Sequence, residues 1–135
     1  MKKISFAALS IVFLLLLVTF VAAIPSNVTL NSPINDYNTS AINIAFNFTA
    51  IDDFDTSLRC NLTINNIVNI TNIEATNGTP QINTTNNFND GLYYWNITCW
   101  DSSNNKNISA TRKFSIDTVP PIISNLRNTS TTNEN

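Results

Sequence analysis

The sequence contains no histidine, and only two glycines and two cysteines stand among its 135 residues. Histidine is the commonest general base and the commonest side-chain metal ligand, so its absence removes both roles. Two separate glycines cannot build a glycine-rich phosphate loop. Paired carboxylates could serve a glycosidase, but so small a domain offers no obvious cleft for one. We therefore expect no enzymatic activity and no resident cofactor.

Basic residues are also scarce. Seven lysines and arginines stand against nine acidic residues, a formal charge of −2. Lys2 and Lys3 lie in the N-terminal leader described next, so the rest of the chain carries five basic and nine acidic residues, a charge of −4. Five single cations form no patch that could follow a phosphate backbone, which excludes nucleic acid as an expected partner.

The only long apolar run is at the N-terminus. It begins after Lys3, extends to Val21 and ends in small residues before Ile24-Pro25. A basic start, an apolar middle and Ala22-Ala23 are typical of a secretory signal peptide, which we assign to residues 1–23. The alternative is an uncleaved membrane anchor, because the run is long enough to cross a bilayer. Either way we expect a secreted or cell-surface protein.

The rest of the chain is organised around Gly91-Leu-Tyr-Tyr-Trp-Asn-Ile-Thr-Cys-Trp-Asp101. Successive side chains of a β-strand point to opposite faces, so alternate positions share one face. Trp95, Ile97 and Cys99 form a candidate buried face, and Tyr93 joins them in the core. Tyr94 and Trp100 fall on the opposite, solvent-facing phase.

The same alternation recurs along the chain, and helical periodicity is absent outside the leader. Ile42 at the start of one stretch, and Ile108 and Ala110 in the last, are in phase with the apolar face. About seven short strands at intervals of roughly ten residues predict an all-β antiparallel sandwich. The other candidate strands lie at residues 27–33, 41–50, 57–68, 69–71, 81–83 and 107–116.

Two motifs resemble a known family. Gly91-x-Tyr-x-Trp-x-Ile-x-Cys-x-Asp101, followed by Asp117-Thr-Val-Pro-Pro121, is similar to the closing half of immunoglobulin-like repeats in large exported proteins of archaea and some bacteria. The resemblance implies an immunoglobulin-like β-sandwich over residues 24–118. Pro120 and Pro121 interrupt the strand pattern, so we expect residues 119–135 to be a linker followed either by the start of a second, truncated repeat or by a short disordered tail. Such repeats carry many functions, so architecture and location follow more firmly than activity.

In that family a partner cysteine lies in a Cys-x-Leu-x-Ile strand, matched here by Cys60-Asn-Leu-Thr-Ile64. Both cysteines fall on inward phases of an exported chain, so we expect one disulfide between Cys60 and Cys99. Its placement should join two strands of one sheet. A metal-binding or catalytic role is the alternative, although no histidine is present to act with them.

Asparagine is the compositional excess, with 24 residues. Ten Asn-x-Ser/Thr sequons are present, about twice as many as this composition would give by chance. A strand that alternates asparagine, an apolar residue and threonine creates sequons automatically, so glycosylation and simple alternation both remain open. Pro80 weakens the sequon at Asn77. The other candidate glycosylation sites are Asn27, Asn38, Asn47, Asn61, Asn69, Asn83, Asn96, Asn107 and Asn128.

Four aspartates are candidate ligands for a hard cation. Asp52, Asp53 and Asp55 precede one strand and Asp101 ends another, and in a sandwich these loops share one end. Four carboxylates there could hold Ca²⁺. The alternative is that the aspartates cap turns in solvated loops.

We expect a structural or adhesive immunoglobulin-like module, non-enzymatic, whose partners are neighbouring repeats, other surface proteins or glycans. A membrane would be involved only through an uncleaved leader. The competing hypothesis is a module that binds carbohydrate or protein through Tyr94 and Trp100, which could stack on sugar rings, or through the aspartate-rich end. A domain accessory to an enzyme further along a longer chain is a third alternative.

Overall fold

The structure is a computed structural model that describes residues 27–122. The expected signal peptide and its helix, the sequon at Asn128 and nearly all of the expected second repeat lie outside the described residues. Within residues 27–122, no helix is long and apolar enough to cross a membrane.

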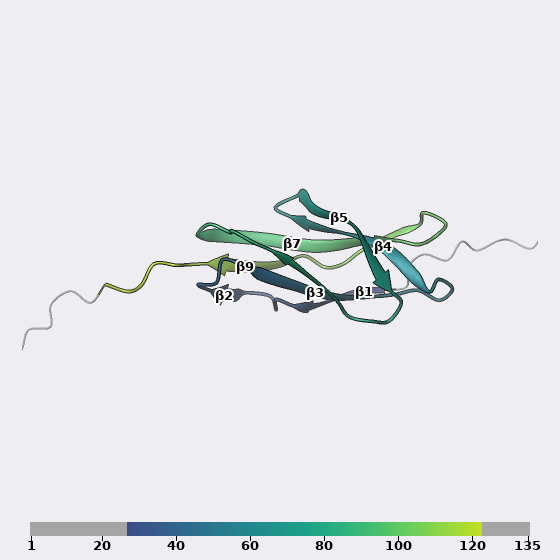
Figure 1. Ribbon diagram of the computed structural model, residues 1–135, viewed down its shortest axis with the longest axis horizontal. Coiled ribbons are helices and arrows are strands. Elements are labelled where there is room, and N and C mark those ends of the chain that lie inside the picture. The colour runs from purple at the N-terminus through teal and green to yellow at the C-terminus, as the bar shows by residue number, and fades with distance from the viewer. Residues whose placement is uncertain (1–26, 123–135) are drawn as a thin grey trace, which may run out of the picture.

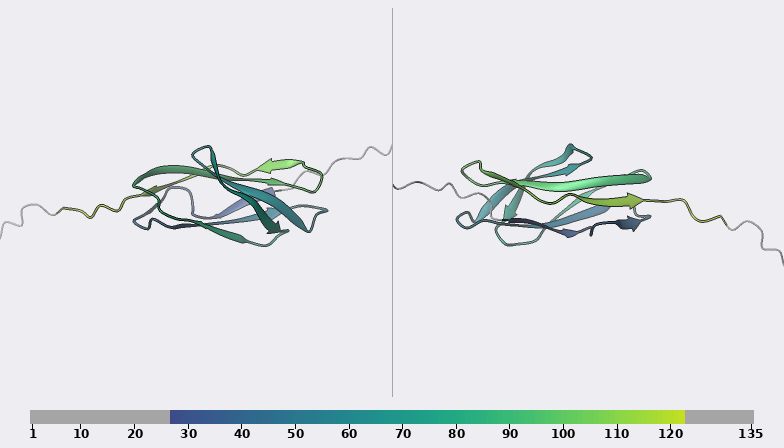
Figure 2. Two further views of the ribbon diagram at one scale, coloured as in Figure 1. Left: turned by 45° about the horizontal axis from the view of Figure 1, so that its top comes forward. Right: turned by 180° about the vertical axis from the view of Figure 1, so that it is seen from behind.

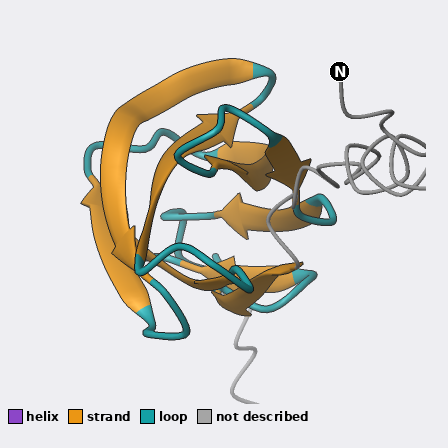
Figure 3. Cartoon of the chain, turned by 90° about the vertical axis from the view of Figure 1, so that its right-hand side faces the viewer, coloured by secondary structure: helices purple, strands orange, loops and turns teal. Residues whose placement is uncertain are grey.

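The described chain is a sandwich of two β-sheets (Figure 1). The smaller sheet has the strand order β1-β3-β6, and the larger has the order β2-β9-β7-β4-β5 with β8 paired to β7. Figure 3 looks along the long axis and shows the two sheets around a common interior. The strands are β1 (Asn27–Ser32), β2 (Tyr37–Thr39), β3 (Ile44–Ile51), β4 (Ser57–Ile64), β5 (Ile67–Thr76), β6 (Gln81–Thr85), β7 (Gly91–Trp100), β8 (Lys106–Ile108) and β9 (Arg112–Ile116).

Period-two alternation produces the core. The inner faces of β3, β4 and β7 bury every second residue, as the sequence predicts. Phe46 lies at the centre, with its ring centroid 4.9 Å from that of Trp95 and 5.7 Å from that of Phe114. Burying each such ring stabilises the fold by about 1.5–3 kcal/mol. Tyr93 packs partly buried on this cluster, and its hydroxyl donates to the Asn89 carbonyl at 3.0 Å.

Seven strands have five or more residues, matching the expected number, and two three-residue strands add to them. One of these, β2, pairs with β9 in parallel, whereas the sequence predicted antiparallel pairing throughout. The chain crosses from one sheet to the other at Pro33, whose carbonyl accepts a hydrogen bond from Arg112 Nη1 at 3.0 Å. This crossing separates β2 from β1 and places it beside the last strand.

The prediction of one continuous strand over residues 107–116 is wrong in its middle. The chain leaves β8 at Ile108 and re-enters the sheet as β9 at Arg112. Ile108 and Ala110 are therefore exposed, and Ser109 is buried between them. The Ser109 hydroxyl accepts from the Ile97 amide at 3.0 Å and donates to the Ala110 carbonyl at 2.9 Å. Ile42 is likewise 43% exposed, because β3 begins only at Ile44.

Asparagine occupies backbone positions that glycine usually takes. Left-handed φ angles strain most side chains, but asparagine tolerates them better than most residues. Six non-glycine residues adopt them, and five of the six are asparagines. Turn geometry therefore accounts for part of the asparagine excess without any glycan. The residues are Asp36, Asn65, Asn66, Asn72, Asn87 and Asn104.

The described chain enters and leaves the sandwich at opposite ends (Figures 1 and 2). Asn27 pairs with Ile51 at the end that also carries the loops at residues 52–56 and 101–105, which we call the N-terminal pole. Ile116 pairs with Gly91 at the other end, the C-terminal pole. Residues 117–122 continue outward from there (Figure 1).

Candidate functional site

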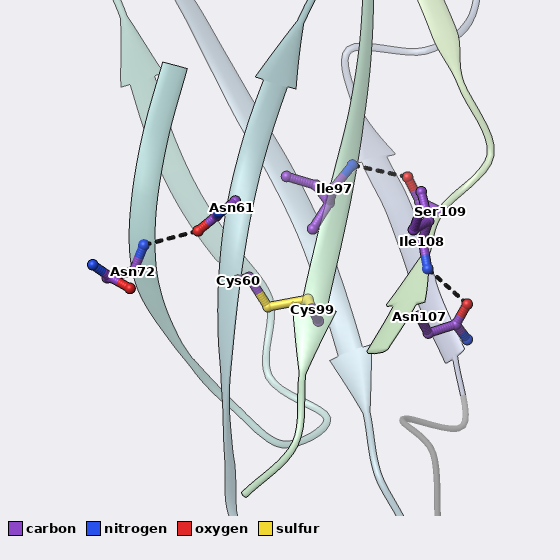
Figure 4. Close-up of a disulfide and its surroundings, with 8 residues drawn as sticks. All are labelled: Cys60, Asn61, Asn72, Ile97, Cys99, Asn107, Ile108 and Ser109. Carbon is purple, nitrogen blue, oxygen red and sulfur yellow. Dashed lines mark hydrogen bonds between the residues drawn. A yellow bond between two sulfur atoms is a disulfide. The ribbon is translucent and has the colours of Figure 1, made fainter. Parts of the chain in front are cut away.

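The disulfide prediction is confirmed. Cys60 on β4 and Cys99 on β7 are direct cross-strand partners within the larger sheet, with Cα atoms 4.1 Å apart and a 2.03 Å S–S bond (Figure 4). Closing a loop of this 39-residue separation stabilises the fold by about 4 kcal/mol in the chain-entropy model. Both cysteines are fully buried, so neither sulfur is exposed as a ligand or nucleophile.

The aspartate loops lie side by side at the N-terminal pole, as expected. Asp55 Oδ2 accepts from the Ser102 amide at 2.7 Å, and Asp55 Oδ1 accepts from the Ser102 hydroxyl at 3.0 Å. These bonds join the loop after β3 to the loop after β7. Within residues 27–122, however, no group of three or more acidic or cysteine side chains is arranged to hold a metal ion.

The aspartate oxygens shape their own loops. Asp52 Oδ1 accepts from the amides of Phe54 and Asp55 at 2.9 and 2.8 Å. Asp101 Oδ1 accepts from the amides of Ser103 and Asn105 at 2.9 and 2.8 Å. This is turn capping by side-chain oxygens. Asp52 Oδ2 is buried and accepts no hydrogen bond from the described part of the chain.

Asn77 holds the aspartate loop in place from a neighbouring turn. Its Nδ2 donates to the carbonyls of Asp52 and Asp55, each at 2.6 Å. Its Oδ1 accepts from the Asp52 amide at 3.1 Å. A glycan on Nδ2 would disrupt this arrangement, so Asn77 has a structural role that sequence reasoning missed. Its Asn-Gly turn was the only signal, and it does not reveal a partner 25 residues away.

Two sequons face each other on the outer surface of the larger sheet. Asn61 on β4 lies opposite Thr98 on β7, and Asn96 on β7 lies opposite Thr63 on β4. Both asparagines are half-buried and alternate with buried core residues. The Asn61 Oδ1 atom accepts from the Asn72 amide at 3.0 Å (Figure 4).

The remaining described sequons are distributed over the molecule. Asn83 is opposite Phe46 and so shares the inner face of its sheet, where a glycan would be crowded. Asn38 accepts a hydrogen bond from the Ser115 hydroxyl, and Asn107 Oδ1 accepts from the Ile108 amide at 2.7 Å. Exposed sequon asparagines are Asn27, Asn38 and Asn69; half-buried ones are Asn47, Asn61, Asn77, Asn83, Asn96 and Asn107.

Tyr94 and Trp100 share the outer face of β7, but the structure does not bring them together. Six residues of extended strand separate them by about 20 Å. Tyr94 is 50% exposed and lies opposite Lys113 on β9. Trp100 is half-buried at the N-terminal pole, where it lines a hollow of about 340 Å³.

Apart from Asp101, the residues that line this hollow with Trp100 were not singled out from the sequence. They come from β4, β5 and the loop after β7. Alternation alone places Arg59 on the outer phase beside Cys60. The bulge that places Asn72 at the hollow has no comparable signal in the sequence. The lining is Ser57, Leu58, Arg59, Asn72, Glu74, Trp100, Asp101, Ser102 and Asn104.

An ion pair lies toward the other end of the same face. Lys113 Nζ is 2.8 Å from Asp36 Oδ1, and the two side chains are 43% and 61% exposed. The hydrogen bond to the Asp36 carboxylate, together with its charge, raises the pKa of Lys113. The pair joins β9 to the turn before β2.

Comparison with known proteins finds solved structures of the same fold. No protein-family model and no curated protein matches the sequence. The fibronectin(III)-like modules of Clostridium thermocellum CbhA match with a TM-score of 0.57 at 12% identity, over 70% of this chain and 100% of that chain. The fold is therefore an immunoglobulin-like β-sandwich, as predicted.

A CARDB domain from Pyrococcus furiosus is more distantly similar. Its solution structure gives a TM-score of 0.47 at 14% identity, over 73% of this chain and 100% of that chain. Its crystal structure in complex with di-metal ions gives 0.44 at 16% identity, over 73% and 96%. At 12% identity, the likeness to the fibronectin(III)-like modules shows the fold alone and not a function.

Proposed function

We propose that this chain is a non-enzymatic structural or adhesive module of an exported, modular surface protein. One observation carries the proposal: the described chain enters the sandwich at one pole and leaves it at the other. Sandwiches with this path can follow one another in a line, so each adds its length to a stalk. The Asp117-Thr-Val-Pro-Pro121 segment supports this role, because consecutive prolines stiffen a connection.

An extracellular location is supported by the disulfide together with the fold and the leader-like N-terminus. Disulfides persist in oxidising compartments and are rare in the cytosol. A buried bridge that stabilises by about 4 kcal/mol provides a large fraction of a small domain's stability. Such a module is suited to a medium in which no chaperone assists refolding.

A structural role is also supported by how the polar groups are used. The carboxylates of Asp52, Asp55 and Asp101 accept loop hydrogen bonds, and Asn77 holds one of these loops. These groups keep the connections compact instead of presenting a reactive centre. The outer-face sequons at Asn61 and Asn96 support a glycan coat, because their positions alternate with buried core residues and so point away from the core.

The test is the intact mass of the natural protein recovered from the cell envelope, measured with and without reduction. We expect loss of residues 1–23, a gain of two hydrogens on reduction, and excess mass that deglycosylation removes. Asn96→Gln should lower the mass by one glycan. Asn31→Gln, which changes an exposed strand asparagine outside any sequon, should lower it by none.

Recovery of the uncleaved chain from the cytosol with two free thiols would contradict the export proposal. A cleaved, bridged chain without sugar would leave the structural module in place and remove its glycan coat.

A further inference from the structure

The hollow at the N-terminal pole lies on the outer surface of the larger sheet, away from the disulfide-containing core. Its volume of about 340 Å³ falls within the range of small-ligand pockets, about 300–1,000 Å³. Pockets that bind small molecules combine an apolar surface with a few fixed polar groups. Trp100 supplies the first, and Arg59, Asn72, Glu74 and Asn104 supply the second.

The floor of the hollow is one cross-strand row of side chains. Arg59 on β4 is directly opposite Glu74 on β5 on one side and Trp100 on β7 on the other. Neighbouring strands lie about 4.8 Å apart, so the row spans about 10 Å. It presents a carboxylate, a guanidinium and an indole in sequence along one line.

The charged members of this row are not neutralised by each other. Opposite charges in direct cross-strand positions normally pair, yet within residues 27–122 the only ion pair is Lys113–Asp36. Arg59 Nη2 instead donates to Asn104 Oδ1 at a long 3.4 Å. Arg59 and Glu74 therefore keep most of their hydrogen-bonding capacity for a ligand.

The walls are built from two asparagines in left-handed conformation. Asn72 has a φ of 55° at an irregularity in the β4–β5 register, and the Asn61 side chain holds its amide (Figure 4). Bulges of this kind redirect a side chain and are frequent beside binding sites. Asn104 has a φ of 63° in the loop that Asp101 caps. Both walls are thus fixed by local hydrogen bonds before any ligand arrives.

We propose that this hollow binds a neutral saccharide of one or two rings. An indole offers an apolar face to the C–H face of a sugar ring. Carboxylate, guanidinium and amide groups are planar and can each make two parallel hydrogen bonds to neighbouring hydroxyls. The lining carries Glu74 and Asp101 against Arg59, so its charge does not favour an anionic ligand. This gives the surface module a recognition site beyond its structural role.

The test uses the full chain secreted by a host that does not attach N-glycans, so that the module's own sugars cannot compete. It is applied to an array of neutral glycans ending in mannose, glucose, galactose or N-acetylhexosamine, with sialylated and sulfated glycans alongside. We expect retention on a subset of the neutral glycans. Trp100→Ala should weaken it by about tenfold or more, a factor that corresponds to one lost ring contact.

The matched control is Tyr94→Ala, which removes the other outer-face aromatic of the same strand and should leave retention unchanged. Because Trp100 is half-buried, Glu74→Gln provides a second probe at an exposed position and should also weaken retention. Thermal melts confirm that each variant is folded. Retention on no neutral glycan, retention only on acidic glycans, or equal retention by Trp100→Ala and Tyr94→Ala would each overturn the proposal.

Discussion

The two faces of β7 share one backbone and have opposite roles. Trp95, Ile97 and Cys99 on the inner face are completely buried, where the Trp95 ring packs on Phe46 of the second sheet and Cys99 forms the disulfide. Tyr94 and Trp100 on the outer face are exposed or half-buried. The inner face determines the fold, whereas the outer face can vary without affecting it. Any activity specific to this module is therefore expected from the outer face.

The largest expected difference between the two faces comes from Trp95→Ala compared with Tyr94→Ala. Removing the Trp95 indole leaves a cavity beside Phe46, and such truncations destabilise by about 3–5 kcal/mol. Tyr94 is half-exposed on the other face, where substitutions change stability by about 0.5 kcal/mol or less. Urea unfolding measures both. Equal losses would show that the outer face also supports the core.

Removal of the disulfide is the second test of the inner face. The double substitution of Cys60 and Cys99 by alanine should destabilise the fold by up to about 4 kcal/mol, chiefly because the unfolded chain gains conformational entropy without the bridge. The unfolding midpoint in urea should fall, and added reductant should then have no further effect. An unchanged midpoint would mean that strand pairing alone maintains this part of the sheet.

A smaller contrast separates two asparagines that belong to sequons. Asn77→Ala removes three hydrogen bonds to the loop at residues 52–55 and should destabilise by about 1–3 kcal/mol. Asn96→Ala, on the outer face, should stay within about 0.5 kcal/mol in unglycosylated protein. Calorimetric melts of the two variants give the comparison. If Asn77→Ala melts like the parent protein, the hydrogen bonds of Asp52 and Asp55 are sufficient to hold the loop.

The inner face could be predicted from the sequence because alternation is a property of neighbouring residues. A period of two is enough to place Trp95 and Cys99 on the buried face. Two cysteines that both face inward can form only one disulfide. Ile108 and Ala110 were wrongly assigned to the buried face. Ser109 is buried instead, because its hydroxyl makes hydrogen bonds to the backbone. Polar burial of this kind cannot be seen in a hydrophobic pattern.

The outer-face site could not be predicted because it depends on register. The row of Glu74, Arg59 and Trp100 exists only because β4 pairs with both β5 and β7 at one level. A shift of one residue would turn every side chain of a strand to the other face. The parallel β2–β9 pair was missed for a related reason, since three residues are too few to show alternation.

The smallest predicted effect is the pH dependence of the outer-face ion pair. Because Asp36 raises the pKa of Lys113 in the folded protein, folding is favoured while this lysine is charged. That contribution is complete below the unfolded pKa of about 10.4 and is lost as the pH rises through the higher folded value. The pair is exposed, so the effect is small and is screened by salt.

The stability difference between the parent protein and Asp36→Asn should shrink between pH 9 and pH 12, as followed by urea unfolding. Lys106→Gln is the control, because Lys106 makes no ion pair within residues 27–122. A difference that stays constant over this range would show that Lys113 does not sense Asp36.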